Sequence, residues 1–218
     1  MVSELGRSVS ERGELVLRRR EDDALELRVN GVFVMDTVET STERALAAAA
    51  LRLADPARVL VGGLGLGFTT AELLTDERVR EVLVVEIEPD LVRWLRDGTV
   101  PDGPRILGDA RVRIRVADVR VAIEEQPYES LDAILLDVDN GPEFLVLDAN
   151  ASLYRERFLR GCLERLRPAG TLLIWSSTRS AALEHALDEA AGSWSVEVHD
   201  VELACRDETY SVYSANRL

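Results

Sequence analysis

The segment that decides the fold runs from Arg58 to Asp90 and reads RVLVGGLGLGFTTAELLTDERVREVLVVEIEPD. A short apolar run, Val59–Val61, breaks into a glycine-rich turn. A helical pattern over Phe68–Leu74 and a second apolar run, Val82–Val85, follow it. A strand, a glycine turn, a helix and a second strand closed by an acid form the unit with which a doubly wound sheet binds a nucleoside. The segment therefore predicts an α/β domain with a nucleoside site at this turn.

Three glycines alternate in the turn, Gly63, Gly65 and Gly67. Glycine adopts backbone angles closed to other residues and lets the main chain approach a ligand. Glu86 stands at the end of the second strand, where a carboxylate can accept hydrogen bonds from both ribose hydroxyls. The glycine spacing is tighter than the dinucleotide pattern G-x-G-x-x-G and is usual in enzymes that bind S-adenosylmethionine. A tight strand–helix turn without a ligand is the alternative interpretation.

Composition limits the class of protein. The 218 residues, 46% of them hydrophobic and 30% charged, indicate an ordinary globular protein of one domain, with at most a small appendage. No apolar run approaches the roughly 20 residues of a membrane-spanning helix, and the N-terminus lacks the pattern of a secretory signal. Cys162 and Cys205 are expected to be reduced, buried thiols, so the sequence predicts a cytoplasmic protein with no membrane partner.

The net charge of −14 opposes binding to nucleic acid and is compatible with a cationic substrate. All 26 basic residues are arginine, so the absence of lysine excludes Schiff-base chemistry. No Cys/His spacing indicates a metal, and His185 and His199 are expected to be structural.

Alternation and turn residues predict a small antiparallel sheet of three strands, over 14–19, 24–29 and 32–35. A helix capped by Thr40, Ser41 or Thr42 follows to about Leu53. We expect an N-terminal β-sheet over 1–38 and a Rossmann-like catalytic domain over 39–218, whose sheet is mostly parallel with a C-terminal antiparallel hairpin. Its expected elements are strands 59–61, 82–86, 112–116, 131–137 and 171–175, helices 68–74, 89–97, 119–125, 153–166 and 181–191, and closing strands 194–201 and 209–214.

A polar residue also follows the third strand of this sheet. Asp118, with Val119 beside it, ends the third strand, where the carboxylate could accept a hydrogen bond from adenine N6. A helix N-cap is an equally good interpretation of Asp118, and both roles can coexist.

The cluster Asp137-Val138-Asp139-Asn140-Gly141-Pro142 follows the next apolar strand. A carboxylate there could orient or deprotonate an amine nucleophile, or balance a sulfonium charge. We take Asp137, Asp139 and Asn140 as candidate catalytic residues, against the alternative of a plain turn. Tyr154, at the next helix, could line an acceptor pocket or pack in the core.

These residues resemble the spermidine synthase family of aminopropyltransferases, which shares the class I methyltransferase fold. The resemblance implies that Glu86 binds ribose, Asp118 binds adenine and Asp137 is the candidate base, and it suggests a homodimer. It covers most of the chain and lies in Leu27–Gly31, Val59–Gly67, Val85–Glu88, Asp109–Val112, Ala117–Asp118, Leu131–Asp137, Leu153–Phe158 and Leu166–Gly170.

The chain departs from the family pattern at three places. Leu66 replaces the aspartate that holds the donor's amino end, Asn140 replaces the second aspartate of the catalytic loop, with Asp139 displaced by one, and a donor-contacting glutamine is replaced near Met35. An unpaired buried ammonium costs several kcal/mol. The departures therefore indicate a retained donor pocket and an eroded polyamine pocket.

Three functions follow in order of preference. The first is methyl transfer from S-adenosylmethionine to a small acceptor. The second is aminopropyl transfer from decarboxylated S-adenosylmethionine to putrescine or a related amine. The third is a non-catalytic nucleoside-binding or assembly module.

Overall fold

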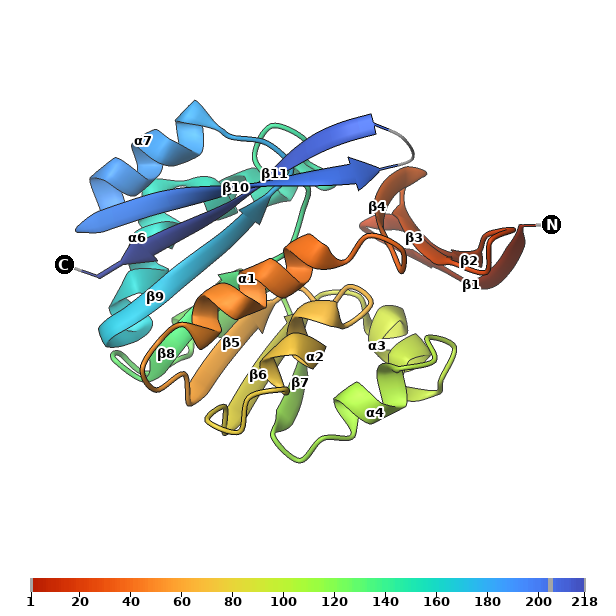
Figure 1. Cartoon of the computed structure of the whole chain (residues 1–218), viewed down its shortest axis with the longest axis horizontal. Coiled ribbons are helices and arrows are strands. Elements are labelled where there is room, and N and C mark those ends of the chain that lie inside the picture. Colours follow the sequence, from red (N-terminus) through yellow and green to blue (C-terminus); the bar gives the residue numbers. More distant parts are fainter. Residues whose placement is uncertain (1, 204–205, 218) are drawn as a thin grey trace.

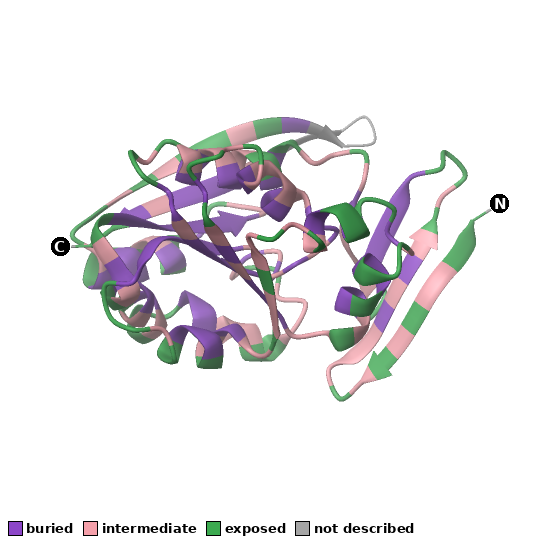
Figure 2. Ribbon diagram, turned by 90° about the horizontal axis from the view of Figure 1, so that it is seen from below, coloured by how far each residue is buried: buried purple, intermediate pink, exposed green. Residues whose placement is uncertain are grey.

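Two sheets of different size organise the chain (Figure 1). The computed structural model describes residues 2–203 and 206–217. A four-stranded antiparallel sheet of order β1-β2-β3-β4 comes first, and a seven-stranded sheet of order β10-β11-β9-β8-β5-β6-β7 follows. The small sheet projects from one end of the larger sheet in both ribbon views (Figures 1 and 2). Its strands are β1 Ser3–Ser10, β2 Gly13–Arg19, β3 Leu25–Val29 and β4 Val32–Asp36.

Strand β1 is the element of the small sheet that the sequence did not predict. A β-bulge between Glu4 and Gly6 shifts its register, so the alternation of apolar side chains is broken. Gly6 lies against Trp94, where a Cβ would stand 2.6 Å from the indole Cε2. This contact joins the small sheet to the larger domain.

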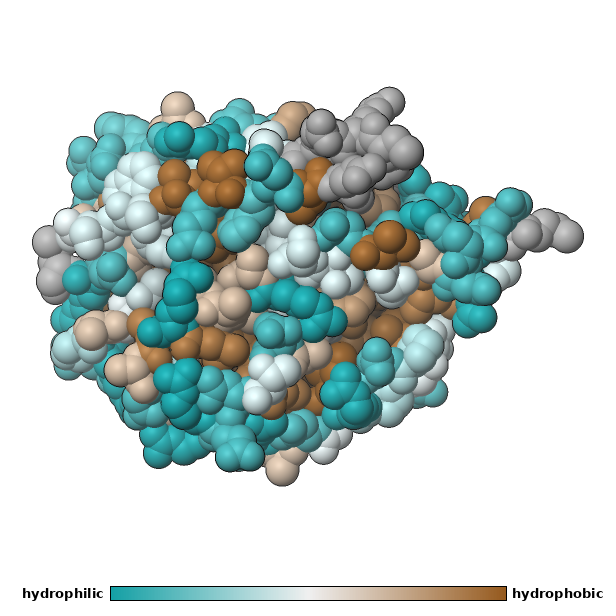
Figure 3. Space-filling view, viewed as in Figure 1, coloured by the Kyte–Doolittle hydropathy of each residue, from teal (hydrophilic) through white to brown (hydrophobic). Residues whose placement is uncertain are grey.

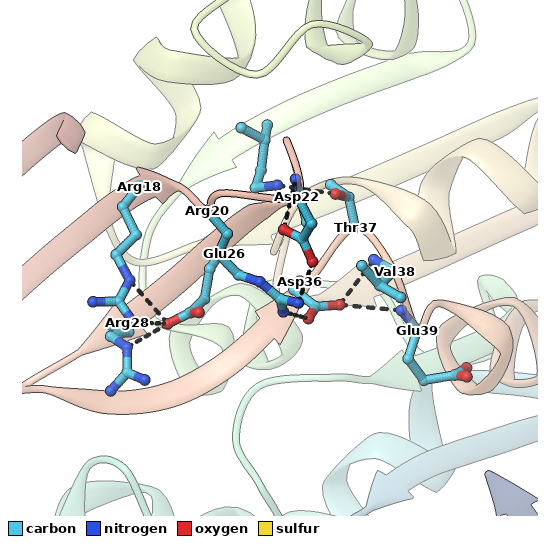
Figure 4. Close-up of polar contacts among 11 residues, drawn as sticks. Arg18, Arg20, Asp22, Glu26, Arg28, Asp36, Thr37, Val38 and Glu39 are labelled. Atoms are coloured by element: carbon cyan, nitrogen blue, oxygen red, sulfur yellow. Dashed lines mark hydrogen bonds and ion pairs between the residues drawn. The ribbon is translucent and has the colours of Figure 1, made fainter. Parts of the chain in front are cut away.

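Two buried acids tie the small sheet together (Figure 4). Glu26 and Asp36 are cross-strand partners and are 5% and 4% exposed. Glu26 forms an ion pair with Arg18 at 2.7 Å and a second pair with Arg28, while Asp36 pairs with Arg20 at 2.6 Å. Buried carboxylates without such partners would be strongly destabilising.

Asp36 also shapes the connection to the first helix. One of its oxygens accepts the amide of Val38 at 2.8 Å and the amide of Glu39 at 3.1 Å, and Thr37 accepts the amide of Leu25. The carboxylate thereby holds residues 36–39 in the turn that leads into helix α1 (Ser41–Leu51).

The larger sheet has the mostly parallel arrangement expected. Strand β5 pairs in parallel with β6 on one side and with β8 on the other, which places the reversal of strand order between β5 and β8. The C-terminal hairpin is also confirmed, and β11 runs antiparallel to both β9 and β10, one place inside the edge. The strands are β5 Arg58–Gly62, β6 Glu81–Glu86, β7 Val112–Val116, β8 Leu131–Leu136, β9 Leu166–Ser176, β10 Ser193–Leu203 and β11 Arg206–Asn216.

Helices cover both faces of this sheet, since side chains along β5 alternate between two cores. Val59 and Val61 pack with α1, α2 and α3, whereas Leu60 packs with α5, α6 and α7. The buried ribbon concentrates between these layers (Figure 2). The remaining helices are α2 Phe68–Leu73, α3 Pro89–Arg96, α4 Gly103–Leu107, α5 Val119–Glu124, α6 Glu156–Arg165 and α7 Ala181–Ala190, with a 3₁₀ helix η1 at Asp148–Tyr154.

Several boundaries differ from those expected. Helix α4 was not expected, and the helix predicted over 153–166 begins at Glu156 because a 3₁₀ turn precedes it. The turn predicted at Pro168–Gly170 lies within β9, and Ala169 has a φ of 66° there. Cys162 is a buried free thiol, while Cys205 lies outside the described residues.

The face seen in Figure 3 is mainly hydrophilic, with small apolar areas between charged side chains. None of the described helices is both long and apolar enough to cross a membrane. The division at residue 38 stays a prediction, because bonds cross it: Ser10 and Arg12 of the first hairpin both donate to Glu88, after β6.

We predict that Asp36→Ala lowers the free energy of unfolding by roughly 2–4 kcal/mol, because it removes a buried ion pair and leaves two amides without an acceptor. The matched control is Asp22→Ala, which removes the exposed partner of the same Arg20 and should cost less than about 1 kcal/mol. Urea denaturation followed by circular dichroism measures both. Equal losses would contradict the structural role of Asp36.

Candidate functional site

An inner cavity of about 140 Å³ opens where β5, β6, β7 and β8 end. It is shared by residues far apart in the sequence, as expected for the carboxyl edge of a doubly wound sheet. Eight of the ten predicted site residues line it; Gly67 and Tyr154 do not. The eight are Gly63, Gly65, Glu86, Asp118, Val119, Asp137, Asp139 and Asn140.

Position 63 must be glycine, because it lies against the protein's own main chain. Its φ is 95°, and a Cβ at this position would stand 1.9 Å from the carbonyl oxygen of Asp137. The amide of Gly63 donates to Val85 at 2.9 Å, and the amide of Asp137 donates to Gly62 at 2.8 Å. These contacts place the glycine turn directly against the ends of β6 and β8, whatever it binds.

The other two glycines have different neighbours. Gly65 has a φ of 51° and lies against Met35 of β4, whose Sδ would be 2.6 Å from a Cβ. The amide of Leu66 donates to the same sulfur at 3.2 Å, and the Leu66 side chain is buried in the core. Gly67, with a φ of 92°, begins helix α2 next to Ile106. At the turn the cavity is therefore lined by backbone and by the Met35 thioether of β4, and the turn itself carries no acid.

Glu86 holds the glycine turn from the end of β6. One carboxylate oxygen accepts the amide of Leu64 at 2.9 Å and the other accepts the amide of Glu88 at 2.8 Å. Burial is the main cause that raises the pKa of Glu86, and these amides partly oppose it. Each oxygen keeps a second lone pair with which to accept from a ligand hydroxyl.

Asp118 is the N-cap of helix α5. Its carboxylate accepts the Arg120 amide at 2.8 Å and the Arg120 Nε at 3.0 Å. These bonds from Arg120 hold the pKa of Asp118 below its ordinary value. Val119 beside it is buried and contacts the cavity. Contact with an adenine amine stays a prediction.

Asp137 follows β8 and accepts a hydrogen bond from the hydroxyl of Thr69 at 2.8 Å. Burial raises the pKa of the Asp137 carboxylate, and the Thr69 hydroxyl opposes this. No described cationic side chain forms an ion pair with it. The structure therefore provides a carboxylate that can take up a proton at the wall of the cavity.

Asp139 organises the loop after β8. It is 7% exposed and accepts the amides of Asn140 and Val146 at 2.8 and 2.6 Å and the side-chain amide of Asn150 at 2.8 Å. The Asn140 side chain donates to the carbonyl of Phe33 at 3.4 Å, which joins this loop to β4. Catalytic roles for both residues stay predictions.

Tyr154 is 5% exposed and packs in the core beneath the sheet. Burial raises the pKa of its hydroxyl well above the ordinary value, with the nearby Asp139 and Asp137 adding to the effect. Acceptor binding by Tyr154 stays a prediction.

Glu43 is the site residue that sequence reasoning missed. It lies in the first turn of α1, is 8% exposed and lines both the inner cavity and an adjoining outer cavity of about 410 Å³. Burial, and next the charge of Asp137, raise the pKa of Glu43. The sequence carried a signal, because Glu43 falls on the same helical stripe as the buried Leu46, Ala47 and Ala50.

The two cavities share a dividing wall, and both are lined by acidic residues. Among the described residues, the lining of neither includes an arginine or histidine, although Asp36, Glu88 and Asp118 pair with arginines outside the linings. The lining acids without an ion pair among the described residues are Glu39, Glu43, Glu86, Asp137 and Asp139. The shared wall consists of Val34, Met35, Glu43, Asn140 and Trp175.

Comparisons with known proteins agree on one family. No family model matches the chain. Polyamine aminopropyltransferase 2 of Pseudomonas aeruginosa is 29% identical over 124 residues, which is 55% of this chain and 33% of that protein. Polyamine aminopropyltransferase 2 of Streptomyces coelicolor is 34% identical over 122 residues, 54% of this chain and 21% of that protein. The chain spans less than half of the curated relatives' own length.

A solved spermidine synthase, crystallised with the transition-state analogue AdoDATO, covers 99% of this chain and is itself covered over 74% of its length. The TM-score is 0.85 at 16% sequence identity, which establishes a shared fold. The fold is thus an α/β fold of the spermidine-synthase type. In sequence and in fold the chain is similar, at low identity, to the spermidine synthase, or polyamine aminopropyltransferase, family.

We predict that Gly63→Ala lowers the free energy of unfolding by about 3 kcal/mol or more, because the methyl group meets a main-chain carbonyl and the backbone angle is left-handed. Gly161→Ala is the control. Gly161 lies in helix α6 with no atom within 4 Å of a new Cβ, so this change should stabilise by roughly 0.5–1 kcal/mol. Chemical denaturation compares the two variants, and a Gly63→Ala protein as stable as the wild type would contradict the close approach.

Proposed function

We propose that this protein transfers the aminopropyl group of decarboxylated S-adenosylmethionine to an amine. The observation that carries the proposal is a pair of largely buried acids without an ion-pair partner. Asp137 lines the inner cavity, Glu43 lies at the boundary between the two cavities, and no lysine, arginine or histidine lines either cavity in the described part of the chain. Such a site favours a cationic donor and a cationic acceptor.

The same observation supports aminopropyl over methyl transfer. S-adenosylmethionine carries a carboxylate at the end of its aminoacyl chain, and decarboxylated S-adenosylmethionine carries only an ammonium there. Placing a carboxylate beside Glu43 and Asp137 would be repulsive, and like charges in contact cost several kcal/mol. The curated relatives are aminopropyltransferases as well, so the comparisons favour this reaction over the methyl transfer first expected.

In the proposed reaction Asp137 first takes a proton from the acceptor's ammonium, and the free amine then attacks the aminopropyl methylene carbon that is bonded to the sulfonium. The new C–N bond forms as the C–S bond breaks, and the electron pair of that bond remains on sulfur to give methylthioadenosine. The product nitrogen keeps its remaining protons as a secondary ammonium. In this scheme Glu86 binds the ribose and Asp118 the adenine.

The inner cavity must widen to admit the donor. Its 140 Å³ lies below the roughly 300–1,000 Å³ usual for small-molecule sites. Part of its lining comes from the loop after β8, whose backbone and Asn150 donate hydrogen bonds to Asp139. In this proposal displacement of the loop supplies the space.

The departures at Leu66 and Met35 leave the glycine turn without an acid for the donor's ammonium. Glu43 faces the inner cavity from α1 and has no described ion-pair partner, and in this proposal it serves the acceptor and not the donor.

We predict that Asp137→Asn lowers methylthioadenosine release from decarboxylated S-adenosylmethionine and an amine by at least about 10²-fold, the usual contribution of a general base. Burial raises the pKa of Asp137, so its basic form fills only as the pH rises through that raised value. The wild-type kcat/KM should therefore fall on acidification from neutral pH, and the Asn variant should lose this inflection.

The control is Asp148→Asn at an exposed carboxylate of the 3₁₀ helix, which should leave the rate and the pH profile unchanged. Methylthioadenosine is quantified by chromatography. Equal rates in the wild type and the Asp137 variant would remove the proposed role of the carboxylate. No release from a broad panel of amines would favour the non-catalytic alternative.

A further inference from the structure

The outer cavity is the larger of the two and lies on the far side of Glu43 from the glycine turn. It is bounded by β4, the start of α1, the ends of β9 and β11 and the loop after β8. Its volume of about 410 Å³ falls within the range of sites that enclose drug-sized ligands. In the proposed reaction this is the acceptor side, so its walls select the amine.

Aromatic side chains form much of that wall. Phe33 and Phe144 come from β4 and the loop, while Trp175 and Tyr210 form a tilted pair with ring centroids 5.2 Å apart. Apolar side chains complete the lining. They are Val32, Val34, Met35 and Leu145.

Among the described residues, only one acid in this cavity is both buried and without a cation. Asp36 already pairs with Arg20 and two amides (Figure 4). Glu39 is half-exposed, accepts the Ser41 amide at 2.7 Å and turns its carboxylate away from the Asp36 network in Figure 4.

Glu43 is the remaining acid. It accepts only the hydroxyl of Thr42, at 3.0 Å, from another side chain, and no described arginine pairs with it. A buried carboxylate of this kind gains most from a ligand ammonium, because the ligand supplies the missing counter-charge.

We propose that the outer cavity binds a primary amine with one cationic end and a bulky apolar, preferably aromatic, body, and that Glu43 receives the ammonium. The body lies against Phe33 and the Trp175–Tyr210 pair, which favours aromatic contact. This rests on the proposed function in one respect, since Glu43 also borders the inner cavity and so places the nitrogen next to Asp137, where the donor's methylene would lie.

A linear diamine fits these walls less well. Its second ammonium would lie against the aromatic wall, which is costly without a partner, or reach the half-exposed Glu39. Exposed ion pairs contribute only about 0–1 kcal/mol. The cavity therefore favours an arylalkyl monoamine over putrescine.

The test is isothermal titration of the protein, without any donor, with 2-phenylethylamine and with putrescine. We expect 2-phenylethylamine to bind about ten-fold more tightly or better. Glu43→Gln should weaken it by at least about ten-fold, and Phe33→Ala should weaken 2-phenylethylamine several-fold while leaving putrescine unchanged. Glu77→Gln, at an exposed acid remote from both linings, is the control.

Tighter binding of putrescine, no binding of 2-phenylethylamine at millimolar concentration, or an unchanged affinity in both variants would overturn the inference. Circular dichroism checks the fold of each variant, and Phe33→Ala decides the question if Glu43→Gln does not fold. Binding of 2-phenylethylamine without any aminopropyl transfer would refute the proposed function alone. Transfer to putrescine by a protein that does not bind 2-phenylethylamine would refute this inference alone.

Discussion

The approach of the glycine turn to the end of β8 is the constraint on which the site depends. Gly63 lies so close to the carbonyl of Asp137 that no side chain fits between them. Because β5 and β8 flank the reversal of strand order, this contact sets the floor of the inner cavity. It also fixes the position of Asp137, whose side chain leaves the main chain at that point. Glycine is needed here for the scaffold first, and the ligand site is its consequence.

The second determinant is the way the small sheet reaches the cavities. The Asp36 carboxylate holds the turn between β4 and α1, and Met35 beside it contacts Gly65 and Leu66. This arrangement brings Glu43 to the boundary between the two cavities. The small sheet is therefore part of the site, and its arginines neutralise its own buried acids, whereas Glu43 has no ion-pair partner among the described residues.

The local sequence pattern was sufficient to predict the larger sheet. The glycines mark the turn, and the spacing of apolar residues marks the strands before and after it and the closing hairpin. These elements were therefore predicted to within a few residues. Strand β1 was missed because the bulge at Gly6 breaks its alternation. The predicted residues converge on one cavity because parallel strands end at one edge, a rule that needs no contact information.

The parts that could not be predicted depend on tertiary contacts. Glu43 belongs to a helix that the sequence gives no reason to place beside Asp137, and the hydrogen bonds of Asp139 to its own loop follow from the loop's closed path. The expectation of an eroded amine pocket came from matching positions along the chain. Glu43, which lines the outer cavity from α1, lies outside the motifs that were compared.

The central claim is that two largely buried acids, Glu43 and Asp137, face the site without an ion-pair partner among the described residues, and donor affinity tests it most directly. Isothermal titration with decarboxylated S-adenosylmethionine and with S-adenosylmethionine, at the same pH and salt, compares ligands that differ only in the carboxylate. The account predicts measurable binding of the decarboxylated donor and affinity at least about ten-fold weaker for S-adenosylmethionine, since like charges meet in a desolvated site. Equal or tighter binding of S-adenosylmethionine, or no binding of either ligand at millimolar concentration, would contradict it.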